Sequence, residues 1–102
     1  MATERYVVAA RLKPGKRAEA ERELEAGPPF DPAELGLTGH AAYLTDDEVY
    51  LVFEGKAARS TALRLAQERL TDVARWQGMV SGLPARVAEV PPEARRLYDW
   101  RR

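Results

Sequence analysis

The sequence predicts an α+β domain in which a four-stranded antiparallel sheet carries two helices on one of its faces. Short apolar runs alternate with longer segments whose apolar residues recur at three- and four-residue spacing. Their order is strand, helix, strand, strand, helix, strand. Right-handed crossovers turn this order into two interleaved βαβ units with both helices on the same face.

The strand segments are apolar on both of their alternating faces. Residues 6–10 read Tyr-Val-Val-Ala-Ala, and residues 49–53 read Val-Tyr-Leu-Val-Phe. Continuous apolar runs need cover above and below the sheet, and two helices on one face cover only that face. We therefore expect a second copy of the chain to cover the other face, in a sheet-to-sheet homodimer.

The first strand and the first helix are separated by turn residues. Residues 5–12 form the expected strand, which ends in a turn at Pro14. Residues 16–26 are strong helix formers without a β-branched residue, and Gly27 ends this helix.

A loop and a hairpin follow the first helix. The loop is expected to contain one helical turn capped by Asp31, with Phe30 and Leu35 fixing it to the body of the domain. Residues 38–45 and 48–54 then form two strands joined by a tight acidic turn.

The longest helical stretch covers residues 56–80, where apolar residues keep the helical spacing. A break at Thr71, which would cap a second and shorter helix, is the alternative. Gly82 and Pro84 are expected to end the helix, and residues 85–90 form the fourth strand.

Residues 1–90 are therefore the expected folded domain. Residues 91–102 form a short charged tail, which we expect to pack on the partner chain through Trp100.

The composition excludes several classes of function. Sixteen Lys and Arg residues balance sixteen Asp and Glu residues, so no net charge attracts nucleic acid or an anionic membrane. The absence of cysteine excludes disulfides and thiolate metal sites, and a single histidine cannot build a zinc site alone. No apolar run approaches the ~20 residues that span a bilayer, so we expect a cytoplasmic protein. Thirteen arginines against three lysines and seventeen alanines are typical of a GC-rich bacterial genome.

Several segments carry a family resemblance: GPPFDPAELGL, LTDDEVYLVFEG, the ARW segment, LPAR and a late Trp. Together with the element order, they resemble an uncharacterised bacterial family within the dimeric α/β-barrel superfamily. Members of that superfamily have a ferredoxin-like βαββαβ protomer and pair sheet to sheet. They include monooxygenases, haem-degrading enzymes, chlorite dismutase-like haem proteins, lactone isomerases and sugar mutarotases. Because their catalytic residues differ, the resemblance implies a fold and an assembly but no reaction.

His40 is the candidate catalytic residue, because it is the only histidine and lies near the start of the second strand. It would act as a general acid or base, or as an axial haem ligand, in a cavity between sheet and helices. The structural alternative is a histidine that hydrogen-bonds to backbone or water at a strand end. The chain has no asparagine, which the haem-degrading members of the superfamily would require. We expect no cofactor, with haem on His40 as the alternative.

The candidate ligand-binding residues are aromatic or charged side chains on the expected strands and the long helix: Tyr43, Tyr50, Trp76 and Arg11. Tyr6 also lies on a strand. Each has a structural alternative, because aromatic residues pack in cores and dimer interfaces. Charged strand residues need a partner if they are enclosed. Arg11, Glu54 and Arg86 could therefore pair across the sheet or face an anionic substrate, and the sequence leaves this open. The acidic turn at residues 46–48 lacks the spacing of a calcium loop, so we expect no metal there.

Two hypotheses of function follow. The first is a small enzyme without a tightly held cofactor, which acts on a hydrophobic or aromatic small molecule with His40 as the proton shuttle. The second is a non-catalytic dimeric module that binds a small ligand or a partner protein. A cavity lined by His40 and tyrosines would favour the first, and a filled interior would favour the second.

Overall fold

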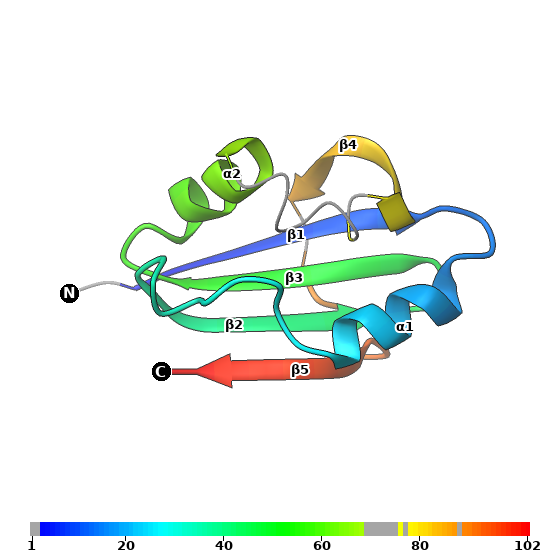
Figure 1. Cartoon of the computed structure of the whole chain (residues 1–102), viewed down its shortest axis with the longest axis horizontal. Coiled ribbons are helices and arrows are strands. Elements are labelled where there is room, and N and C mark those ends of the chain that lie inside the picture. Colours follow the sequence, from blue (N-terminus) through cyan, green and yellow to red (C-terminus); the bar gives the residue numbers. More distant parts are fainter. Residues whose placement is uncertain (1–2, 69–75, 77, 88) are drawn as a thin grey trace.

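The computed structural model describes residues 3–68, 76, 78–87 and 89–102, without the side chains of residues 66–68 and 81–87. In this part of the chain, one antiparallel sheet has the strand order β4-β1-β3-β2-β5, and two helices lie against it (Figure 1). The elements are β1 (Glu4–Leu12), α1 (Arg17–Glu25), β2 (Leu37–Leu44), β3 (Glu48–Gly55), α2 (Ala58–Glu68), β4 (Val80–Val87) and β5 (Arg95–Arg101). No described helix has the length and apolarity that a membrane crossing requires.

The predicted α+β class and the βαββαβ order are confirmed, and the strand order β4-β1-β3-β2 fits a ferredoxin-like fold. The four predicted strands are all present, but the sheet has a fifth, which the expected tail supplies. β5 pairs antiparallel with β2 of its own chain, with Trp100 opposite His40 and Tyr98 opposite Ala42. The tail extends the sheet because β2 offers a free edge, and Tyr98 and Trp100 stand at the two-residue spacing of a strand.

The boundary between the long helical stretch and the fourth strand was also wrong. Residues 76, 78 and 79 are helical as expected, but β4 already begins at Val80 rather than at residue 85. Pro84 lies inside β4, which is an edge strand whose register against β1 shifts between Ala9 and Arg11. Edge strands and bulges tolerate proline, because no inner ladder hydrogen bond is lost. The possible break at Thr71 falls outside the described residues.

Both helices pack on the same face of the sheet, which we call the helix face. Ala20 and Leu24 of α1 join a core cluster with Leu44 and Val49. Ala58 and Leu65 of α2 join a second cluster around Phe53. The two helices lie over opposite ends of the sheet (Figure 1).

The opposite face, which we call the helix-free face, is covered by the chain itself. The connection from β4 to β5 passes behind the sheet to reach its far edge (Figure 1). Val90 in this connection packs against Val7, Ala41 and Val52. Five apolar strand residues of this face are at most 5% exposed, namely Val7, Ala9, Ala41, Tyr50 and Val52. The expectation that this face has no cover within one chain is therefore wrong, although the homodimer itself stays a prediction.

Candidate functional site

His40 lies on the helix face at the junction of the two core clusters. Strand alternation points its side chain away from the helix-free face, and its neighbours across the strands are Phe53 and Trp100. The residue is fully buried, with 0% of its surface exposed. A fully buried histidine needs hydrogen-bond partners for its ring nitrogens.

Both nitrogens of the imidazole have such partners. Nδ1 lies 2.9 Å from the backbone oxygen of Val52. Because a carbonyl oxygen only accepts, Nδ1 carries the hydrogen and donates it. Nε2 is then the acceptor of the neutral ring, and the hydroxyl of Tyr98, at 2.5 Å, donates to it. Among the described side chains, no buried nitrogen or oxygen lacks a partner.

The surroundings keep this pair uncharged at neutral pH. Burial lowers the pKa of His40 to about 4, and the hydrogen bond to Val52 opposes this only in part. Burial also raises the pKa of the Tyr98 hydroxyl above its ordinary value. Moving the proton from Tyr98 to His40 would place two charges in an apolar environment. The lowered pKa of His40 and the raised pKa of Tyr98 both oppose this transfer.

Aromatic rings from separate segments enclose His40, and we call this group the ring cluster. The ring centroids of Phe53, Phe30 and Tyr98 lie 4.7, 5.0 and 5.2 Å from that of His40. Trp76 extends the cluster, at 6.4 Å from Phe30 and 6.3 Å from Tyr98. The cluster thus joins β2, β3 and β5 to the loop after α1 and to the segment before β4.

The helix face beside the ring cluster keeps apolar surface exposed in the middle of the sheet. Val8 of β1 and Leu51 of β3 lie on the inner strands, yet both are only partly buried. Leu51 packs against both core clusters and so lies between the regions that α1 and α2 cover. Phe30 and Trp76 are also partly buried. Inner-strand residues under helices are normally the deepest in a domain, so this exposure distinguishes the region.

The structure brings one predicted ligand-binding residue, Trp76, to His40. Tyr43 and Tyr50 lie opposite each other on the helix-free face, because Tyr43 is an odd number of residues from His40. The Tyr50 hydroxyl donates to Glu48 at 3.0 Å. Tyr6 is on the helix face and packs against the Phe53 cluster.

The charged strand residues pair locally. Arg11 lies at the hairpin end of β1 with its guanidinium 4.0 Å from Asp47, which belongs to the acidic turn. Glu54 accepts a hydrogen bond from Arg101 of β5. The side chain of Arg86 lies outside the described part of the chain.

Sequence reasoning missed the two residues that complete the site, Tyr98 and Phe53. Tyr98 was assigned to a tail, although its spacing from Trp100 is that of a strand. Phe53 lies within a run apolar on both faces, where the pattern does not tell which side a residue takes.

The residues around His40 do not fit haem, because Nε2, the imidazole nitrogen that carries no hydrogen, is enclosed within a fully buried residue and accepts from Tyr98. Among the described residues, no group of three or more His, Cys, Asp or Glu side chains could hold a metal ion.

Comparison with known proteins adds no relative: no protein-family model matches this chain, and neither does a curated protein or a solved structure.

Proposed function

We propose that this protein binds an uncharged apolar or aromatic small molecule on the helix face, between α1 and α2. The observation that carries the proposal is the partial exposure of Val8 and Leu51 on the inner strands, beside the rings of Phe30 and Trp76. Ligand sites are mostly apolar and aromatic surfaces of this kind. None of these four residues carries a charge, which favours an uncharged ligand.

We propose binding without acid–base chemistry, in line with the second hypothesis. A general base needs a free lone pair within reach of the ligand, and the lone pair of His40 Nε2 accepts from Tyr98. A general acid near neutral pH needs a bound proton to give, and burial keeps the His40 pKa at about 4. In this proposal, His40 and Tyr98 support the site by fixing β5 against β2 and β3.

Binding can be tested with 2-naphthol, an uncharged aromatic probe, by following methyl and indole signals in NMR spectra. We expect shifts at Val8, Leu51 and the Trp76 indole, and none at Val7 and Val52. Trp76→Ala should weaken binding about tenfold, the loss of one stacking ring. Tyr43→Phe on the helix-free face is the control and should leave the affinity unchanged. Shifts confined to Val7 and Val52 would contradict the proposal.

The second candidate is a cofactor-independent enzyme that acts on a hydrophobic or aromatic small molecule. It is favoured by the position of Tyr98, which is itself partly exposed while its hydroxyl reaches the buried His40. A ligand hydroxyl that displaced the Tyr98 hydroxyl would meet the Nε2 lone pair.

The enzyme candidate predicts that the protein accelerates deuterium exchange at the acidic C–H of 2-tetralone in D₂O, and that His40→Gln abolishes the acceleration. Proton NMR measures the exchange directly. Equal rates with and without the wild-type protein, under conditions where 2-tetralone binds, would exclude this candidate.

We also propose the finer points of assembly and family: membership of the dimeric α/β-barrel superfamily and pairing of two copies through the helix-free face. The sheet order supports the family. A partner would contact Tyr43, Val90 and Pro91, which are partly exposed, and the tail could reach it from the adjacent edge strand. Light scattering at micromolar concentration should return twice the chain mass of 11.4 kDa. A particle of one chain mass would contradict the dimer.

A further inference from the structure

The helix α1 is weakly anchored to the sheet by apolar contacts. Only Ala20 and Leu24 of its nine residues are buried, and most of the others are charged. Helices in globular proteins gain most of their stability from the packing of an apolar face. With two buried residues, one of them an alanine, α1 depends on further contacts for its position.

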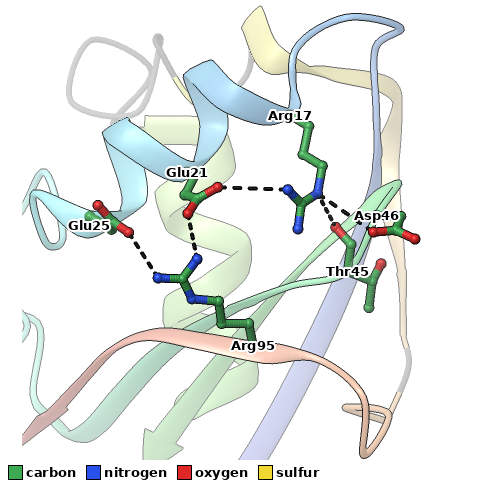
Figure 2. Close-up of polar contacts among 6 residues, drawn as sticks. All are labelled: Arg17, Glu21, Glu25, Thr45, Asp46 and Arg95. Carbon is green, nitrogen blue, oxygen red and sulfur yellow. Dashed lines mark hydrogen bonds and ion pairs between the residues drawn. The ribbon is translucent and has the colours of Figure 1, made fainter.

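An ion-pair network supplies those contacts (Figure 2). Arg95, the first residue of β5, donates to Glu21 at 2.5 Å and lies 3.5 Å from Glu25. Arg17, the first residue of α1, lies 3.7 Å from Glu21 one helical turn further along the same face. Arg17 also reaches the β2–β3 turn, where its Nε donates to the Thr45 backbone oxygen at 3.4 Å. The network therefore ties α1 to the sheet at two places.

The chain on either side of α1 can act as a pair of hinges. Gly15 has a φ of 78° before the helix, and Gly27 has a φ of 94° after it. Glycine adopts these left-handed conformations without strain, and hinges are the few loop residues that absorb changes of backbone angle. Three residues after Gly27, the ring of Phe30 lies against that of His40, with the two ring planes tilted by 43°. A movement of α1 about these hinges would move Phe30 with it.

We propose that α1 and the loop through Phe30 form a lid over the other rings of the ring cluster, held closed by the contacts of Arg95 with Glu21 and Glu25. Its role as a ligand gate rests on the proposed function, because only a bound molecule would need the lid to open. Screening by salt weakens exposed ion pairs, so the lid opens more often as ionic strength rises.

Hydrogen exchange of the α1 amides tests the lid without any ligand. In Arg95→Gln and in the Glu21→Gln/Glu25→Gln double variant, exchange in residues 20–25 should become about fivefold faster, as expected for the loss of an exposed ion-pair network. Exchange in β1 and β3 should stay at the wild-type rate. Arg22→Gln is the matched control, because it removes an exposed charge of α1 outside this network and should leave α1 exchange unchanged.

Two outcomes would overturn the lid. One is unchanged α1 exchange in both variants, and the other is faster exchange in β5 with α1 unaffected, which would assign the network to strand docking. A separate experiment with a ligand tests the role of the lid as a gate. The association rate of 2-naphthol should be higher in Arg95→Gln than in the wild type, and it should rise with salt. If α1 exchange becomes faster but 2-naphthol does not bind, the lid is supported and the proposed function is rejected. If 2-naphthol binds but α1 exchange is unchanged, the proposed function is supported and the lid is rejected.

Discussion

The two faces of the sheet are closed by different parts of the chain, and they are closed to different degrees. On the helix-free face, a single extended connection covers the centre, and Val7, Ala41 and Val52 are buried beneath Val90. On the helix face, two helices cover the ends, and Leu51 in the middle stays partly exposed. Among the described residues, the inner strands are therefore more deeply buried on the helix-free face than on the helix face. Cover depends on where a segment lies and not on whether it is a helix.

The two faces also differ in one enclosed polar pair. The helix-free face is rimmed by ion pairs between exposed side chains, such as Arg5 with Glu89 and Arg96 with Asp99. The helix face also carries exposed ion pairs, around α1, but among its described residues the hydroxyl of Tyr98 and the buried His40 form a polar pair enclosed by aromatic rings. Exposed pairs are screened by water, whereas a buried pair must be fully satisfied. Substitutions on the two faces should therefore lower the free energy of unfolding by different amounts.

The largest effect is expected from adjacent residues of β3 that point to opposite faces. Phe53→Ala should lower the free energy of unfolding by about 3–5 kcal/mol, because it removes a buried ring from the core. Val52→Ala should cost about 2 kcal/mol, because it removes two methyl groups beneath Val90. Urea denaturation measures both. A Val52→Ala variant as stable as the wild type would contradict the cover of the helix-free face.

The next effect is the pH dependence that His40 contributes. Its folded pKa of about 4 lies below the ordinary value of 6.5, so the unfolded chain takes up the proton first as the pH falls. This contribution to stability is complete above pH 6.5 and is lost progressively down to about pH 4. It amounts to about 3 kcal/mol. As the only histidine, His40 gives a single set of ring signals in NMR. A midpoint near 6.5 for these signals would show that the ring is not buried as described.

A smaller loss in the free energy of unfolding is expected from Tyr98→Phe. This substitution removes the hydroxyl and leaves Nε2 of His40 buried without a hydrogen-bond donor. An unsatisfied buried acceptor costs about 1–3 kcal/mol. Tyr43→Phe on the helix-free face is the control, and a change within about 0.5 kcal/mol is expected there. If thermal denaturation ranked the two variants in the opposite order, the polar pair would not belong to the core.

The smallest effect should come from the charged rim. Arg101→Gln removes the partner of Glu54 on the helix-free face, and both side chains are partly exposed. We expect a loss of less than about 1 kcal/mol that disappears at high salt. Arg102→Gln, which removes a neighbouring charge, serves as the control. A salt-independent loss of several kcal/mol would mean that this pair is enclosed, and the contrast between the two faces would fail.

The sequence was sufficient for the fold class and the position of His40, because both follow from local spacing. It was not sufficient for the fifth strand, because residues 95–102 carry charges that obscure the two-residue spacing of Tyr98 and Trp100. The sequence also did not show that Tyr43 and Tyr50 lie on the opposite face of the sheet from His40. In a run that is apolar on both faces, the pattern does not indicate which face each residue takes. The cover by Val90 is a long-range contact with no local signal. The partner of His40 depends on both missed features, so the site could be predicted only in part.

The contrast between the two faces can be measured most directly by adding a soluble paramagnetic compound and recording the relaxation of valine and leucine methyl groups. The account predicts strong enhancement at Val8 and Leu51 on the helix face, and weak enhancement at Val7 and Val52. The reverse order, with Val7 and Val52 the more strongly relaxed, would contradict it.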